Sequence, residues 1–206
     1  AIVAHYDFTD SSRASVDTEP NSTADDFTSG SGINPFIKTG VGNPAPADAI
    51  EIGNGGDLGG IDPGGNETYA IDNNDYYSFT LSPQAGLLIN LESLTFDFFH
   101  TANGLNSESG KDAFSLYSSA DGFAASLGTA TMGGRNSWHS RSITLSDDAS
   151  VQGLTSTTEL RLYVWQSGRL TSSSHDLSID NIVLNGEVVP EPASATLLGL
   201  AGLAAL

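Results

Sequence analysis

Residues 160–165, Leu-Arg-Leu-Tyr-Val-Trp, alternate between aliphatic and other side chains with a period of two. Successive side chains of a β-strand point to opposite faces of a sheet. One face of this strand would therefore carry three aliphatic side chains, those of Leu160, Leu162 and Val164. The other face would carry a guanidinium and two aromatic rings, from Arg161, Tyr163 and Trp165. The stretch predicts a strand with one face against a core and an unusual second face.

Short runs of the same kind lie on both sides of this stretch, separated by Gly, Pro, Asn, Asp and Ser. Their alternating apolar residues fall in 77–81, 94–98, 114–116, 143–145 and 177–179. Short period-two strands with turn residues between them are typical of an antiparallel sandwich. No window before the last residues predicts an amphipathic helix. We therefore expect an all-β fold, an antiparallel β-sandwich of the jelly-roll kind.

The composition excludes several classes of function. The chain has 206 residues, with Lys+Arg 7 and Asp+Glu 25, a formal net charge of −18 and no cysteine. Nucleic-acid binding needs clustered Lys and Arg, so no nucleic-acid partner is expected. The acidity also disfavours anionic lipid and favours cations. Without cysteine there is no disulfide scaffold, thiol catalysis or Cys-ligated zinc.

No motif of a catalytic site is found in the sequence. Glu is sparse and no Glu-x-Asp-x-x-Glu run places two carboxylates on one strand face, as a jelly-roll glycosidase would need. The four His show no metal-site spacing, and there is no Gly-x-Ser-x-Gly elbow. We expect a protein that is not an enzyme. A polysaccharide-degrading enzyme stays as an alternative, because a site assembled in space leaves no local motif.

The closing strand changes its apolar parity. Leu177 and Ile179 are odd-numbered, whereas Ile182 and Leu184 are even-numbered. One face can stay buried through that change only if an extra residue is inserted, so a β-bulge is predicted at Asp180-Asn181.

A bulge frees backbone carbonyls and re-aims an acidic side chain, which suits an oxygen-ligated Ca²⁺. First and last strands are often neighbours in jelly rolls, so Asp7 could join Asp180 and Asn181 as a ligand. The alternative is that Asp180 and Asn181 bond only to local backbone. A second acidic run, Asp72-Asn73-Asn74-Asp75, lacks the Gly and the closing Glu of an EF-hand, and predicts a solvated loop.

The face with Arg161, Tyr163 and Trp165 is the first candidate ligand surface. Aromatic rings stack on the apolar faces of sugars, and a guanidinium donates to hydroxyl groups. The alternative is that these side chains belong to the interior of the sandwich, because strand aromatics commonly serve packing. Trp138, beside His139 and Arg141, is a second and weaker candidate in a predicted loop.

The C-terminus departs from the strand pattern. Pro190, Glu191 and Pro192 precede an apolar stretch, Ala193–Leu206, that predicts a short helix. Fourteen helical residues span about 21 Å, less than the ~30 Å hydrocarbon core. The alternative is a disordered proline linker with a hydrophobic end.

This stretch resembles the PEP-CTERM sorting signal of Gram-negative bacteria, although the Arg-rich tail of that family is absent here. The resemblance implies export, recognition by an exosortase, cleavage near the motif, and delivery to the cell surface or matrix. It divides the chain into a sandwich ectodomain, 1–187, and a sorting signal, 188–206, which is the only membrane contact expected.

The body also resembles jelly-roll ectodomains. The similarity is in Tyr6-Asp7-Phe8, in 118–123, in 160–165 and in Ile179-Asp180-Asn181-Ile182. The closing strand is similar to the last strand of jelly-roll carbohydrate-binding modules of the concanavalin or galactose-binding-like kind. That resemblance implies a structural calcium held partly by the Asp of that strand.

Together these features predict an exported, non-catalytic protein that binds or organises exopolysaccharide, with a structural Ca²⁺. A self-assembling surface or filament subunit, a homo-oligomer without glycan affinity, is the alternative from another class.

Overall fold

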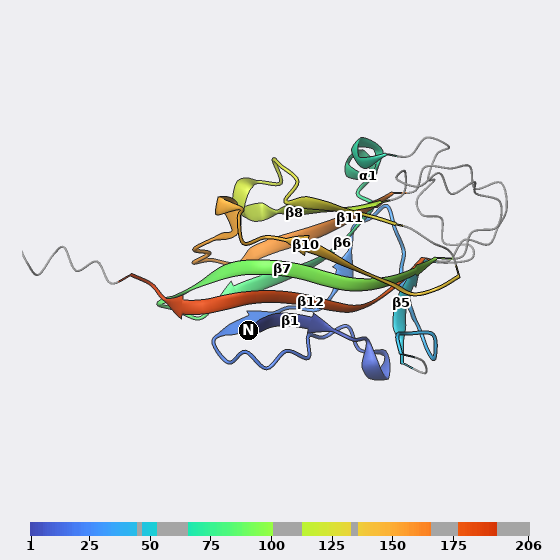
Figure 1. Cartoon of the computed structure of the whole chain (residues 1–206), viewed down its shortest axis with the longest axis horizontal. Coiled ribbons are helices and arrows are strands. Elements are labelled where there is room, and N and C mark those ends of the chain that lie inside the picture. The colour runs from blue at the N-terminus through green and yellow to red at the C-terminus, as the bar shows by residue number, and fades with distance from the viewer. Residues whose placement is uncertain (45–46, 53–65, 101–112, 133–135, 166–176, 193–206) are drawn as a thin grey trace, which may run out of the picture.

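The computed structural model describes residues 1–44, 47–52, 66–100, 113–132, 136–165 and 177–192. Two antiparallel sheets pack face to face (Figure 1). Sheet A consists of β1 (Ile2–Tyr6), β4 (Phe36–Lys38), β5 (Ala49–Ile52), β7 (Leu87–His100), β10 (His139–Thr144) and β12 (Leu177–Pro190). Its strand order is β10-β7-β12-β5-β4, and β1 also pairs with β12.

Sheet B consists of β2 (Ser22–Ala24), β3 (Thr28–Ser29), β6 (Tyr76–Pro83), β8 (Ala113–Ser118), β9 (Gly128–Thr131) and β11 (Thr158–Trp165). Its order is β2-β6-β11-β8-β9, and β3 also pairs with β6. From β5 onward nearly every connection passes from one sheet to the other, which is how a jelly roll wraps. The prediction of an antiparallel β-sandwich of this kind is confirmed.

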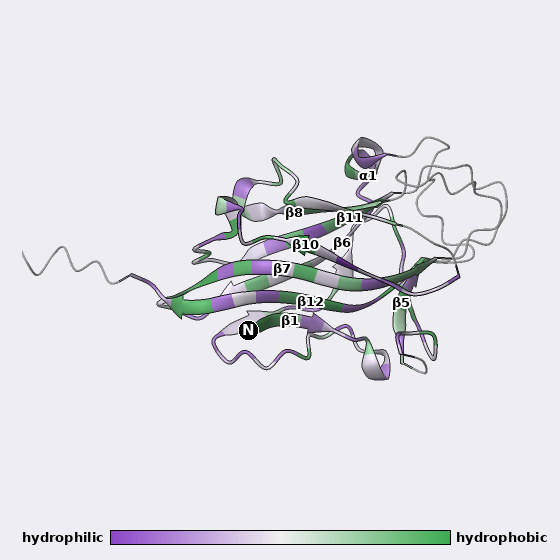
Figure 2. Cartoon of the chain, in the orientation of Figure 1, coloured by the Kyte–Doolittle hydropathy of each residue, from purple (hydrophilic) through white to green (hydrophobic). Residues whose placement is uncertain are grey.

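The apolar faces of the two sheets form one core. In β11 the aliphatic side chains face it, with exposed fractions of 0% for Leu160, 2% for Leu162 and 1% for Val164. Phe114 of sheet B lies against Phe96 and Phe98 of sheet A, with ring centroids 4.9 and 5.7 Å apart. Figure 2 shows the alternation of hydrophobic and hydrophilic residues along β7 and β12. The period-two pattern was therefore sufficient to predict which side chains are buried here.

The predicted bulge is present in β12. Asp180 pairs with Asp97 and Val183 pairs with Thr95, so Asn181 and Ile182 together face one residue of β7. Asn181 adopts a left-handed conformation with φ 49°. The bulge lies where the partner strand on the other edge of β12 changes. There, β5 pairs with 177–179 and β1 pairs with 182–185.

Two features near residue 70 differ from the prediction. A short helix, α1 (Glu67–Asn73), occupies a segment for which none was expected. Its ends are capped, since the Asn66 side chain accepts from the Tyr69 N–H and Asn74 adopts a left-handed conformation. Asp75, placed in a solvated loop by the sequence, is only 2% exposed. The backbone N–H of Asp75 donates to the Ala70 carbonyl of the helix at 2.9 Å.

The C-terminal strand extends beyond the expected domain boundary. The position between 187 and 188 lies inside β12, whose residues 188–190 pair with Leu87–Ile89. Residues 193–206, where the apolar helix is expected, lie outside the described residues. Within the described ranges, no helix is long and apolar enough to cross a membrane.

Candidate functional site

The candidate ligand residues of β11 lie on the outer face of sheet B. Their side chains point away from the core that Leu162 helps to form, as the alternation requires. Tyr163 is 4% exposed and Trp165 is 9% exposed, however, so neither ring is open to solvent. The expectation of an open platform at these two rings is not met, because other side chains pack over them. Arg161 keeps 23% of its side chain exposed.

The guanidinium of Arg161 is held between two aromatic rings. Its central carbon lies 4.6 Å from the ring centroid of Tyr76 and 3.9 Å from that of Phe123. Glu159, two residues earlier on the same face, accepts hydrogen bonds from Nε at 2.8 Å and Nη2 at 3.2 Å. We call Tyr76, Phe123, Arg161 and Glu159 the arginine stack.

The electrostatics of the arginine stack keep its cation charged. Burial lowers the pKa of Arg161, but the hydrogen bonds to Glu159 and Tyr163 and the charge of Glu159 outweigh that effect, and the net pKa is raised. Burial also raises the pKa of Tyr76. The stack is therefore a fixed, partly exposed surface that combines ring faces with N–H donors.

Beside the stack, the helix α1 is bonded to strand β8. The carboxylate of Glu67 accepts from the hydroxyl of Tyr117 at 2.9 Å and from the hydroxyl of Ser115. Burial, followed by the hydrogen bond and the charge of Glu67, raises the pKa of Tyr117 to about 12. These bonds fix the first turn of α1 over the outer face of sheet B.

Trp138 lies on the opposite side of the sandwich, at the start of β10. Its ring contacts that of Phe99 on β7, with centroids 5.7 Å apart, and both side chains are partly exposed. Because His139 pairs with Phe98, Trp138 and Phe99 share the outer face of sheet A. Arg141, its sequence neighbour, instead lies over Phe98, 5.1 Å from the ring centroid.

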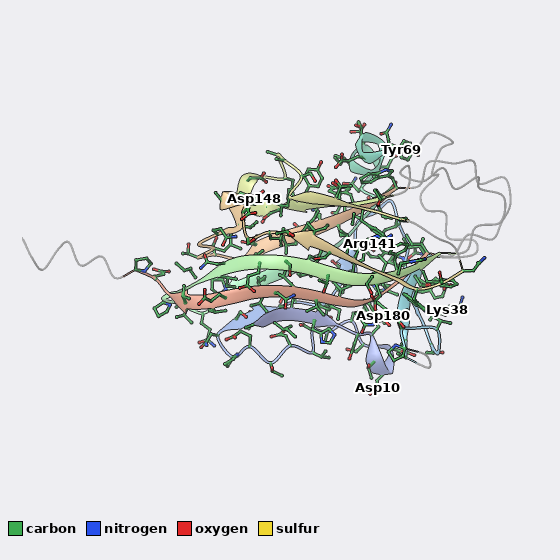
Figure 3. The ribbon with its side chains drawn as sticks, viewed as in Figure 1. Asp10, Lys38, Tyr69, Arg141, Asp148 and Asp180 are labelled. Carbon is green, nitrogen blue, oxygen red and sulfur yellow. The ribbon has the colours of Figure 1, made fainter. Side chains whose placement is uncertain are left out.

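At the bulge, Asp180 is the centre of a polar network. It is 1% exposed, and its two carboxylate oxygens accept from the backbone N–H groups of Asn43 and Asn181, each at 2.7 Å. Figure 3 shows Asp180 and Lys38 at the same end of the sandwich. A Cβ at Gly42 would come within 2.6 Å of the Asp180 carboxylate and 2.3 Å of the Asp48 carbonyl oxygen. Only glycine at position 42 therefore lets the backbone approach Asp180 so closely.

A second carboxylate lies next to Asp180, on the neighbouring strand. Asp97 accepts from the side-chain amides of Asn43 and Asn181, both at 3.0 Å, and from the hydroxyl of Ser140. The amide of Asn181 also donates to the Asn43 carbonyl. The alternative that Asp180 and Asn181 bond only to local backbone is thus correct only in part. Both residues also bond to Asn43, which lies almost 140 residues earlier in the sequence.

Among the described residues, the hydrogen-bond partners of Asp180 are backbone N–H groups, with no cationic side chain. Burial is the largest cause that raises the pKa of Asp180, to about 6; the two N–H bonds act against it, and the charges of Asp97 and Asp7 add to it. Asp7 follows β1 and is close enough to contribute to this effect. Across the described residues, no three His, Asp or Glu side chains converge in a way that could hold a metal ion.

The first residue of the expected sorting motif, Pro190, is the last paired position of β12, and Glu191 and Pro192 follow it. Pro190, Glu191 and Pro192 are exposed, and the Glu191 N–H donates to the Gly86 carbonyl at 3.0 Å. The motif is therefore held against the turn between β6 and β7, next to the sandwich.

Comparison with known proteins shows similar folds only. No protein-family model matches the chain, and no curated protein matches it. A xylan-binding domain of family CBM22 aligns with TM-score 0.43 and 10% identity over 89% of this chain and 93% of its own. The mannan-recognising module TmCBM27 aligns with TM-score 0.42 and 12% identity over 89% and 96%.

An adhesin domain gives a similar result. The K3 cleaved adhesin domain of Lys-gingipain from Porphyromonas gingivalis aligns with TM-score 0.42 and 12% identity, over 90% of this chain and 99% of that domain. At these identities the likeness concerns the fold alone, and the function proposed below rests on the geometry of the site.

Sequence reasoning missed several residues of this site. Tyr76, Phe123 and Glu67 come from separate segments and only folding brings them to Arg161 and Tyr117. The one available signal was the off-phase aromatic Tyr76, which alternates with the core residue Tyr77. An aromatic residue on the strand face that points away from the core is therefore a candidate residue of a binding surface.

Proposed function

We propose that this chain is an exported, non-catalytic module that binds or organises polysaccharide at the cell surface or in the extracellular matrix. The arginine stack carries the proposal. It places a guanidinium between two rings on the outer face of a sheet, where a solvated sandwich would present simple polar side chains. Ring faces and fixed N–H donors together suit the apolar faces and hydroxyl groups of a sugar.

The charge of the chain favours a neutral glycan. At a net charge of −18, an anionic polymer would be repelled, and the cation of the stack is already paired with Glu159. The pair Trp138–Phe99 is proposed as a second and weaker contact on sheet A, because its rings are partly exposed and stand beside the hydroxyl of Ser140.

The test is binding of the intact protein to soluble neutral polysaccharides such as galactan, xylan and mannan. Arg161→Ala is expected to lower the affinity about tenfold or more, which is about 1.4 kcal/mol or more, because it removes the guanidinium from between the two rings. Trp138→Ala is expected to lower affinity only a few-fold. The exposed Thr144→Ala on β10 serves as the matched control and should bind like the parent. Equal affinity of Arg161→Ala and the parent for a bound glycan would remove the stack as the site.

The same preparations separate the alternatives. Assembly that depends on protein concentration, without affinity for any glycan, favours a structural surface or filament subunit. Release of reducing ends from a polysaccharide favours a degrading enzyme.

The second part of the proposal is a structural Ca²⁺ at the bulge. Asp180 and Asp7 would supply carboxylate oxygens, and Asn181 and nearby backbone carbonyls would supply neutral oxygens, a mixture that Ca²⁺ accepts. The support is electrostatic: the charges of Asp97 and Asp7 act on the buried carboxylate of Asp180, and a divalent cation would neutralise them. When bound, the ion would supply charge neutralisation and crosslinking between β1 and β12.

Calcium is expected to stabilise the fold. At 100 times its dissociation constant it would add about 2.7 kcal/mol, or about 5–10 °C in the unfolding midpoint. Thermal unfolding with CaCl₂ and with EDTA measures this. Asp180→Asn is expected to lose the response, and the exposed Asp147→Asn is expected to keep it. An identical midpoint of the parent protein in CaCl₂ and EDTA would exclude the site.

The third part of the proposal is sorting through Pro190-Glu191-Pro192 by an exosortase. The exposure of these three residues supports it, since a processing enzyme needs access to the chain. The hydrogen bond of Glu191 to Gly86 places the motif at the very edge of the folded body.

A further inference from the structure

The outer face of sheet B carries a second buried cluster. Tyr117, Tyr163 and Trp165 are 8%, 4% and 9% exposed, and they pack with Ala70 and Ala113 in a group separate from the main core. An outer sheet face of a sandwich usually meets water with polar side chains. Three large rings on that face therefore need a cover.

The described element that lies over these rings is α1. Its Ala70 is fully buried in the cluster, and Figure 1 shows the helix outside sheet B beside the end of β11. A seven-residue helix is too short to be stable alone, so its position depends on its contacts. These contacts include the bonds of Glu67 with Ser115 and Tyr117, and the Asp75 carbonyl, which accepts from the Val164 N–H at 3.0 Å.

The second of these attachments contains an unfavourable group. Asp75 is 2% exposed, and its Oδ1 has no hydrogen-bond partner in the described part of the chain. It follows the C-terminal end of α1, where unpaired carbonyls carry partial negative charge. Burial raises the pKa of Asp75 to about 6 and is the sole cause of the shift; no charged side chain contributes. A Cβ on Gly32 would come within 2.0 Å of the Asp75 Oδ1, so the Gly32 backbone packs directly against this carboxyl.

The rings under α1 continue the arginine stack. Tyr163 contacts Tyr76 of the stack with ring centroids 5.1 Å apart, and contacts Tyr117 at 5.4 Å. An opening of α1 would therefore extend the exposed aromatic surface without a break from Tyr76 to Trp165.

We propose that α1 is a displaceable cover, and that a neutral polysaccharide bound at the arginine stack extends onto Tyr117, Tyr163 and Trp165 when α1 moves away. This rests on the proposed function for its ligand, but the movement of α1 does not. Continuity with the stack and the acidity of the chain select an uncharged glycan as occupant.

The sign of the pH effect follows from Asp75. Its pKa is higher under the cover than in water, so protonation favours the closed form and ionisation favours the open one. Opening is at its minimum below about pH 4, rises by up to about 100-fold between about pH 4 and pH 6, and levels off above that range.

The first experiment follows Trp165 alone. The chain has two Trp, so Trp138→Phe leaves Trp165 as the single fluorophore. Acrylamide quenching of this variant is expected to rise severalfold from pH 4.5 to pH 7.5. Adding Asp75→Asn should remove the pH dependence, and adding the exposed Asp72→Asn, on the same helix, should preserve it. Glu67→Ala should raise quenching at both pH values.

Hydrogen exchange locates the change. The N–H groups of Asn74 and Asp75, which bond to Ile71 and Ala70, should lose protection in Glu67→Ala while β7 and β12 keep theirs. Quenching that stays unchanged in Glu67→Ala, with intact exchange at Asp75, would overturn the cover.

Binding separates the cover from the proposed function. Glu67→Ala is expected to bind a soluble neutral polysaccharide more tightly than the parent, because displacing α1 costs less binding free energy in this variant. Weaker binding by Glu67→Ala would show that α1 belongs to the binding surface and would overturn the proposal. Suppose that Trp165 becomes accessible in Glu67→Ala but neither this variant nor the parent binds any glycan. That result would refute the polysaccharide function and would still support the movement of α1.

Discussion

Ile182→Asp is expected to unfold the domain, whereas Val183→Asp is expected to leave it folded. Ile182 is 1% exposed and faces the core, while Val183 lies on the outer face between His5 and Thr95. An aspartate at 182 loses about 2–3 kcal/mol of apolar burial and puts an unpaired carboxylate in the core, for a total of about 5 kcal/mol or more. Whole domains are stable by only about 5–15 kcal/mol.

The pair tests the bulge directly. A regular strand continuing from Ile179 would bury residue 183 and expose residue 182. Circular dichroism and urea unfolding of the two variants measure the difference, with about 1 kcal/mol or less expected for Val183→Asp. If Val183→Asp is the variant that unfolds, β12 has no bulge at Asn181.

Phe114→Ala is expected to destabilise the domain by about 3–5 kcal/mol. The Phe114 ring is fully buried between the sheets and meets Phe96 and Phe98 edge-on or tilted. Its removal leaves a cavity between β8 and β7, and packed strands cannot close it. Urea denaturation gives the change in unfolding free energy.

The matched control is Phe36→Ala on β4, whose side chain is 47% exposed at the edge of sheet A. We expect a cost below about 1 kcal/mol there. Similar losses for the two variants would mean that Phe114 is not a core residue.

The period-two signal was enough to predict most of the sandwich. It placed Leu160, Leu162 and Val164 in the core, because sheet alternation is a local rule that needs no knowledge of distant segments. It also located the bulge, since the parity change from Ile179 to Ile182 has one economical solution. The pairing of β1 with β12 followed from jelly-roll topology and is present.

Burial on the outer faces could not be predicted in the same way. Tyr163 and Trp165 have the spacing of an open surface, and what covers them is a helix more than 90 residues earlier in the chain. That helix has no amphipathic repeat long enough to detect; capping by Asn66 and packing of Ala70 define it instead. Asp75 appeared solvated because polar residues precede it in the sequence, although the fold buries its carboxyl.

The Asp180 network could be predicted from the sequence only in part. The sequence predicted Asp180 and Asn181 as a special position and Asp7 as a neighbour. It did not reveal Asn43 or Asp97, because the first belongs to a distant loop and the second appears as an ordinary outward residue of β7. Whether the group holds calcium is the subject of the unfolding experiment above.

The length of β12 has a consequence for orientation. Its 14 residues extend about 46 Å and run along the length of sheet A (Figure 1). If the protein is attached to a cell through the residues after Pro192, the long axis of β12 would point away from the cell. The end of the sandwich at which β12 begins would then face outward from the envelope.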